Sequence, residues 1–321
     1  MSLPDKVVER ALMVLAFSSI TILALITLFI FREGAPLMAR VGLGNFFSTE
    51  WRPGEGQFGI ALMIVGSTVV TFGALVLGVP FGLACAIVLA EMAPDRARTL
   101  LKPVIEILAG IPSVVYGFIG IVVLLPWIRS NLGGPGASAL AASLILGIMV
   151  LPTIIGISID ALQAVPNSYR EASLAMGATR WQTIRRVVLP AARSGLVAAI
   201  ILGMGRAVGE TMAVIMVAGN SVQMPRSPLD PVRTLTANIA LEMGYAAGDH
   251  QAALFATGIV LFAIIMALNT VANLARGRRV KRVATPAAAA AGADDLEAAR
   301  DDAHQGGSPP GAPGVTGTQR P

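Results

Sequence analysis

The chain has 321 residues, of which 55% are hydrophobic and 13% charged, and its net charge is +5. A soluble domain carries roughly 25% charged residues, and the apolar residues here form long blocks without strand-like alternation, which excludes a soluble α/β protein. Two histidines and one cysteine predict no metal site, no internal disulfide and no cofactor. No glycine precedes a lysine and the basic residues are not interleaved with aromatic ones, so neither a phosphate-binding loop nor nucleic-acid binding is expected.

Six apolar blocks are each long enough to cross a bilayer, which takes about 20 residues. The first is too long for the core of a signal peptide and has no small-residue cleavage site after it, so it is predicted to be retained. The blocks cover residues 11–31, 58–90, 104–127, 137–162, 195–219 and 251–274. The sequence therefore predicts an all-α integral membrane protein with about six transmembrane helices.

Proline and glycine positions inside the blocks predict how these helices run and pack. Membrane helices tolerate an internal proline when neighbours satisfy the freed carbonyl, so the third block is expected to stay one span despite Pro112. Gly78 and Gly82, and again Gly205 and Gly209, have the spacing of close helix–helix contacts.

Lysine and arginine are distributed unequally between the two sides of the predicted spans. With the N-terminus inside, the inner segments carry fifteen of these residues and the outer loops six. The positive-inside rule then places both termini in the cytoplasm. Residues 284–321 are rich in alanine, proline, glycine and aspartate and hold too little apolar surface to fold. The sequence thus predicts a membrane domain of residues 1–283 and a disordered cytoplasmic tail of residues 284–321.

The longest inner loop, residues 165–192, reads VPNSYREASLAMGATRWQTIRRVVLPAA. Ser168 followed by Glu171 is typical of a capping box and predicts a helix start, and Gly177 is expected to end that helix. A second short helix follows and Pro190 is expected to close the unit. Its apolar residues Trp181, Ile184 and Val188 fall on one side. A helix–glycine–helix of this kind suits docking against another protein.

This loop resembles the EAA loop of ABC importer permeases. Six positions match its spacing: Glu171, Ala172, Gly177, Val187, Leu189 and Pro190. Ser173 replaces the second alanine of that pattern and Val187 the usual isoleucine. The resemblance implies a MetI-like permease fold, and it implies that the loop couples to a cleft in a separate ATP-hydrolysing subunit.

Three further segments resemble the PstC-type permeases of bacterial phosphate-specific ABC importers. They are FREGAPLM at 31–38, FGIALMIVGSTVVT at 58–71 and GRAVGETMAVIMVAGN at 205–220, and the likeness extends over about residues 4–275. The PstA-type sister subunit shares Gly-Glu-Thr but continues it differently. The resemblance implies import of inorganic phosphate through the bacterial inner membrane. The implied partners are a PstA-like second permease, a PstB-like ATP-binding subunit dimer, a PstS-like periplasmic phosphate-binding protein and membrane lipid.

Arg206 and Glu210 lie four residues apart in the fifth block and are expected on one helical face. A charge at bilayer depth costs roughly 2.5–3.5 kcal/mol on insertion scales, so the pair is expected to face the bundle interior or a water-filled path. In one interpretation Arg206 donates to phosphate oxygens during passage while Glu210 holds the guanidinium. In the other, the two form a structural ion pair that fixes helix register.

Several alternatives stay open from the sequence. The EAA loop alone also permits a permease for another oxyanion, an amino acid or another small solute. An intramembrane enzyme is disfavoured because the spans lack Ser/His, HExxH and paired-aspartate motifs, and a scaffold has no reason to bury Arg206. The last outer loop is predicted to be solvated, with contact to a periplasmic binding protein as the other possibility. Its charged residues are Asp230, Arg233, Glu242, Asp249 and His250.

Overall fold

The computed structural model describes the backbone of residues 3–280 and the side chains of residues 8–94 and 96–270. It divides into two units, residues 1–272 and 273–321. The described part of the second unit, residues 273–280, is the end of helix α13 (Asp249–Val280). The predicted tail, residues 284–321, lies outside the described residues.

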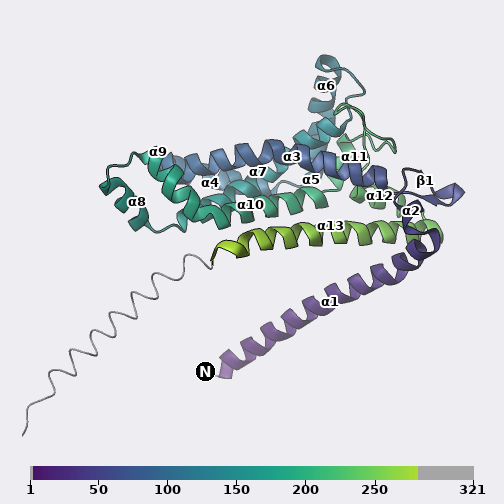
Figure 1. Cartoon of the computed structure of the whole chain (residues 1–321), viewed down its shortest axis with the longest axis horizontal. Helices are drawn as coiled ribbons and strands as arrows, with labels where there is room; N and C mark the ends of the chain where they lie inside the picture. The colour runs from purple at the N-terminus through teal and green to yellow at the C-terminus, as the bar shows by residue number, and fades with distance from the viewer. Residues whose placement is uncertain (1–2, 281–321) are drawn as a thin grey trace, which may run out of the picture. The chain divides into compact units, whose positions relative to one another are not determined.

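Helices make up most of the described chain (Figure 1). The remaining α-helices are α1 (Leu3–Val41), α2 (Leu43–Phe46), α3 (Ala61–Ile87), α4 (Asp95–Gly110), α5 (Ser113–Ile119), α6 (Leu125–Asn131), α7 (Ala139–Gln163), α8 (Asn167–Ala175), α9 (Arg180–Thr183), α10 (Leu189–Gly209), α11 (Met212–Val217) and α12 (Leu235–Glu242). Three π-helical segments, Val88–Met92, Gly120–Leu124 and Ile184–Val188, continue α3, α5 and α9. A short hairpin joins β1 (Trp51–Arg52) to β2 (Gln57–Phe58) through the 3-10 turn Pro53–Glu55.

Six helical stretches of the described chain are long and apolar enough to span a membrane, which confirms the predicted fold class. They are Val8–Val41, Ala61–Met92, Ser113–Asn131, Ala139–Gln163, Arg180–Gly209 and Asp249–Thr270. In Figure 1, α8 and α9 lie at one end of the long helices α3, α7 and α10, and α11 and α12 lie toward the other. We call these the α8 end and the α12 end.

Helices α3, α7 and α10 pack side by side through glycines (Figure 1). A β-carbon on Gly78 would lie 2.6 Å from Cγ2 of Val150, and one on Gly82 would lie 2.8 Å from Cγ2 of Ile154. On α10, a β-carbon on Gly203 would lie 2.7 Å from Cγ1 of Ile154. In lipid, close packing of this kind holds helices together in place of the hydrophobic effect.

The close contact predicted for Gly78 and Gly82 is therefore confirmed. The same prediction for Gly205 and Gly209 is wrong within this chain, because no described atom lies within 4 Å of a β-carbon at either position. The i, i+4 spacing identifies a flat helix face but not the neighbour that covers it.

The third predicted span is broken, which corrects the prediction of one helix over residues 104–127. Helix α4 ends at Gly110, Ile111 has extended backbone (ψ 127°), and α5 begins at Ser113. Pro112 has no N–H to donate to the carbonyl of Leu108. The hydroxyl of Tyr116 donates to that carbonyl instead, at 2.9 Å.

An apolar cluster closes the α12 end of the first unit. It joins the ends of α1 and α13 to the hairpin and α2, with Phe46 and Leu254 fully buried. Its other buried members are Leu37, Trp51, Phe58, Ile60, Leu62, Met63, Leu235, Ala253, Ala256 and Val260.

Candidate functional site

The predicted helix–glycine–helix unit is present as α8, Gly177 and α9. We call it the docking unit, after the role that the sequence predicts for it. Gly177 has φ +80°, a left-handed conformation that ends α8 as predicted. The predicted capping box at Ser168 is wrong, because α8 starts after Pro166 with no side-chain cap. The capping box belongs to α9 instead: the Gln182 N–H donates to the Thr179 hydroxyl at 3.3 Å, and the Thr179 N–H donates to Oε1 of Gln182 at 2.9 Å.

The unit presents a mixed apolar and charged surface. None of the residues of α8 is buried, and Glu171 and Ala172 are exposed together with large apolar side chains. The exposed apolar side chains are Tyr169, Leu174, Met176 and Trp181. An exposed patch of this composition is typical of a protein interaction site. Ser173, the departure from the EAA pattern, has its hydroxyl 2.9 Å from that of Thr183 and so joins α8 to α9.

Pro190 does not close the unit, which corrects the prediction. The proline lies at the start of α10, which directly follows the π-helical segment Ile184–Val188. Local π-helical turns of this kind let a membrane helix continue through a proline. Leu189 is half-buried beside it. Helices α9 and α10 form one continuous span, Arg180–Gly209, that starts well before the predicted residue 195. The span therefore connects the docking unit directly to Arg206 near its other end.

Arg206 and Glu210 were predicted to lie on one helical face, and this prediction is wrong. Helix α10 ends at Gly209, and Glu210 has extended backbone (ψ 130°). Oε1 of Glu210 accepts from the N–H of Ala213 at 3.2 Å, on the first turn of α11. The backbone carbonyl of Glu210 accepts from the Thr236 hydroxyl at 3.0 Å. Within the part of the chain whose side chains are described, no ion pair joins Arg206 to Glu210, and Arg206 is exposed.

The break after Gly209 lies level with the break at Pro112. A β-carbon on Gly117 would lie 3.1 Å from Cα of Ala213, and one on Gly120 would lie 2.6 Å from Cγ1 of Val217, so α5 and α11 run side by side in the same direction. Broken helices with charged neighbours are typical of substrate paths in transporters.

Tyr116 belongs to this intramembrane site and was not predicted from the sequence. Its hydroxyl lies within electrostatic range of the Arg206 charge while it donates to Leu108. The site therefore combines a cation, a carboxylate and a phenol at two adjoining helix breaks. Only the proline in the third block pointed toward Tyr116, because a freed carbonyl needs a donor nearby.

The prediction that the charged residues of the last outer loop are solvated is wrong for Glu242, which is buried, while Asp230, Arg233 and His250 are half-buried. Glu242 is only 6% exposed. Its carboxylate accepts from Nη1 of Arg233 at 2.5 Å and from Nε1 of Trp51 at 3.0 Å, and it lies 2.8 Å from Nε2 of His250. This cluster joins the hairpin, α12 and α13 at the α12 end. Asp249 is exposed as predicted and pairs with Arg40 at 2.6 Å.

Replacing Glu242 by glutamine is expected to lower the free energy of unfolding by about 2 kcal/mol, because the charge network loses its buried anion while the guanidinium of Arg233 stays half-buried beside it. Thermal unfolding in detergent measures the change. Asp249→Asn is the matched control at the same end, since its exposed ion pair contributes less than about 1 kcal/mol. Equal effects of the two substitutions would contradict a stabilising role for the buried cluster.

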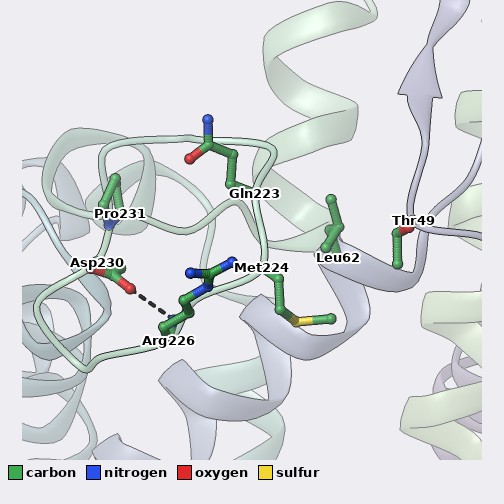
Figure 2. A pocket seen from close by; sticks show the side chains of 7 residues that line it. All are labelled: Thr49, Leu62, Gln223, Met224, Arg226, Asp230 and Pro231. Atoms are coloured by element: carbon green, nitrogen blue, oxygen red, sulfur yellow. Dashed lines mark hydrogen bonds between the residues drawn. The ribbon is translucent and has the colours of Figure 1, made fainter.

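A pocket of about 610 Å³ opens in the same part of the chain (Figure 2). Oδ2 of Asp230 accepts from the backbone N–H groups of Arg226 and Ser227, at 2.7 and 2.9 Å, and so shapes the loop that forms one wall. The pocket is lined by Thr49, Leu62, Gln223, Met224, Arg226, Asp230 and Pro231. It is a polar surface hollow at the α12 end, well removed from the docking unit.

Six spans, two adjoining helix breaks beside a cation and an exposed docking unit at one end define a multi-pass membrane permease. The chain belongs to the family of binding-protein-dependent transport system inner membrane components, whose model matches residues 78–285. This family consists of ABC transporter permeases, which are transporters and not enzymes.

The chain is similar to two curated relatives over most of its length. It is 47% identical to the probable ABC transporter permease protein YqgH of Bacillus subtilis, over 67% of this chain and 71% of that one. It is 37% identical to the phosphate transport system permease protein PstC of Xylella fastidiosa, over 73% and 78% of the two chains. A solved bacterial ABC transporter involved in the import of the acidic polysaccharide alginate shares the fold, with a TM-score of 0.56, 16% identity and coverage of 85% and 99%.

Proposed function

We propose that the chain is the PstC-type permease subunit of a bacterial ABC importer that moves inorganic phosphate into the cytoplasm. The proposal is supported by phosphate transport permeases that are 32–37% identical to the chain over most of its length. One structural observation carries the mechanism: Arg206 is exposed on the surface of this chain, within a membrane span. A cation at that depth in lipid is costly, so Arg206 must face another protein or an aqueous path.

The proposed partners are those that the resemblance to phosphate importers implies. A PstA-like second permease covers the face that carries Arg206, and the path for phosphate runs between the two permeases. A PstB-like ATPase dimer binds the docking unit and hydrolyses ATP, and a PstS-like binding protein delivers phosphate at the α12 end. Membrane lipid surrounds the remaining apolar faces of the spans.

The mechanism is alternating access without covalent chemistry in this chain. ATP-driven closure of the ATPase dimer moves α8 and α9, and the continuous span Arg180–Gly209 carries that movement to Arg206. The guanidinium offers fixed, paired donors to phosphate oxygens as the path opens. Glu210, held at the break by α11, lowers the net charge of the empty site and so limits trapping of the anion.

Uptake of radiolabelled phosphate by cells that lack only this chain tests the proposal. Loss of uptake that returns with the wild-type chain is the expected result. An unchanged phosphate uptake, combined with loss of uptake of sulfate or an amino acid, would overturn the assignment in favour of another small solute.

The proposed topology has the α8 end and both termini in the cytoplasm, so Thr49 at the α12 end faces the periplasm. A Thr49→Cys variant in a Cys85→Ser background is expected to react with a membrane-impermeant maleimide in intact cells, because Thr49 is exposed. Met176→Cys is the matched control: it is 88% exposed on the docking unit and is expected to react only after permeabilisation. The reverse pattern would invert the topology.

A further inference from the structure

Arg170, near the start of α8, uses all five of its guanidinium N–H groups. Nη2 and Nε donate to the two carboxylate oxygens of Glu91, at 2.6 and 3.1 Å. Nη2 also donates to the carbonyl of Leu162 at 2.9 Å, and Nη1 donates to that of Val165 at 2.7 Å. A longer bond of 3.4 Å joins Nη1 to Oδ1 of Asn167. One side chain thus ties α8 to the π-helical end of α3 and to the end of α7.

This contact is well shielded from water, since the side chain of Glu91 is 8% exposed and that of Arg170 is 20% exposed. The pKa of Arg170 is raised, chiefly by its hydrogen bond with Glu91, while burial acts in the opposite direction. The guanidinium therefore stays charged. Because α8 buries none of its residues, packing does not fix its direction relative to α7. The Ser173–Thr183 hydroxyl contact holds α8 to α9. The two parallel hydrogen bonds from the planar guanidinium to the Glu91 carboxylate, here called the fork, hold α8 to α3, and such paired contacts are directional.

The end of α3 is held a second time, from α4. Arg98 donates through Nε to the carbonyl of Leu89 at 3.1 Å and through Nη2 to that of Ala90. Both carbonyls belong to the same π-helical segment, Val88–Met92, as Glu91. This segment is therefore held from α4 as well as from α8. Bending of the segment alone cannot absorb a movement of α8.

From this anchor the contacts continue through the bundle. The glycines of α3 lock it to Val150 and Ile154 of α7, and Gly203 locks α10 to the same Ile154. Closely packed elements of this kind shift as bodies, since packed interiors transmit strain. A rotation of α8 thus reaches α3 and α7 through Arg170, in addition to α10 through the continuous span.

We propose that Arg170 is a positioning residue for transport: its pair with Glu91 fixes α8 to the ends of α3 and α7, so that movement of the ATPase reaches the whole bundle. The inference rests on the proposed function, because it takes α8 as the helix that contacts the ATPase. Without the fork, the ATPase still binds α8, but α8 hinges at the Val165–Pro166 joint and α3 and α7 stay behind.

The test uses the complete importer in proteoliposomes and measures phosphate moved per ATP hydrolysed. Arg170→Lys keeps the charge but cannot form the fork, and Glu91→Gln keeps the shape but not the charge. Both variants are expected to co-purify with the ATPase normally and to lose about tenfold in phosphate moved per ATP. Arg193→Lys is the matched control: Arg193 is exposed on α10 and is expected to keep the wild-type ratio.

The double variant Arg170→Met, Glu91→Leu separates positioning from stability. It removes both shielded charges at once, which restores stability without restoring the fork. The ratio is expected to stay low. Recovery of the ratio in the double variant, a wild-type ratio in Arg170→Lys, or loss of ATPase co-purification in Arg170→Lys would each overturn the proposal.

A readout without substrate separates this inference from the phosphate assignment. In a Cys85→Ser background, Leu202→Cys places a thiol on the exposed side of α10, and its maleimide reaction rate is compared with and without ATP. The ATP-dependent change is expected in the parent and absent with Arg170→Lys. If the importer moves no phosphate but shows this pattern, the phosphate assignment fails and the role of Arg170 stands. An equal response in both overturns the role of Arg170.

Discussion

Replacing Arg206 by glutamine is expected to abolish phosphate uptake while the chain remains inserted and bound to its ATPase. Losing a charged, paired contact with an anion in a shielded site costs on the order of 3 kcal/mol, so uptake should fall by about a hundredfold. The helix is preserved, because glutamine is a good helix former and Arg206 makes no ion pair among the described residues. Uptake in cells and co-purification of the ATPase measure the two halves of this prediction.

The controls use the same helix and the same break. Arg193→Gln removes an exposed arginine from the other end of α10 and is expected to leave uptake unchanged. Glu210→Gln keeps an oxygen that can accept from Ala213, so it removes the charge without removing the start of α11. It is expected to impair uptake less than Arg206→Gln. If the double variant Arg206→Gln, Glu210→Gln regains uptake, the two residues only balance charge and Arg206 does not contact phosphate.

Replacing Gly177 by aspartate is expected to separate the permease from its ATPase and so abolish uptake. A β-carbon at Gly177 would meet no atom within 4 Å, so the substitution does not clash within this chain. It adds a negative charge to the docking surface at a position with φ +80°. The measurement is the amount of ATPase subunit that co-purifies with the tagged permease, together with phosphate uptake.

Two companion variants show which property of Gly177 matters. Asparagine adopts the left-handed conformation readily and has the shape of aspartate without its charge, so Gly177→Asn is expected to keep most of the association. Valine is strongly disfavoured in that conformation, so Gly177→Val is expected to lose it through the backbone. Normal co-purification and uptake in Gly177→Asp would refute the docking role of this turn.

The number and order of the spans could be predicted from the sequence because bilayer thickness fixes the length of an apolar helix. Helix breaks could not. Pro80 and Pro152 remain inside α3 and α7, whereas Pro112 separates α4 from α5. Each proline frees one carbonyl, and whether the helix continues depends on neighbours distant in the sequence. At Pro112 the Tyr116 hydroxyl supplies the missing donor and the chain bends there.

The candidate site shows the same limit. The sequence identified Arg206 and Glu210 because charges inside an apolar block are conspicuous, but helical spacing placed them on one face of a helix that in fact ends between them. Glu91 and Arg170 lie 79 residues apart, and no local pattern joins them. Glu242 was predicted to be solvated because it lies in a polar loop, yet the fold buries it. The local periodicity of a sequence does not predict contacts between residues so far apart in the chain.

The packing of α1 against α13 has a consequence for how the protein is made. The central stretch of α1 buries none of its residues, and its contacts gather near its end. Phe29 meets Phe255 edge to face at 5.4 Å, a β-carbon on Gly34 would touch the backbone of Ala256, and Arg40 pairs with Asp249. The partner of Arg40 is synthesised 209 residues later.

At the usual 5–20 residues per second, a ribosome takes about 10–40 s to cover that interval. Helix α1 therefore enters the membrane before the part of α13 that contacts it has been made. A chain truncated before residue 249 leaves α1 without these contacts.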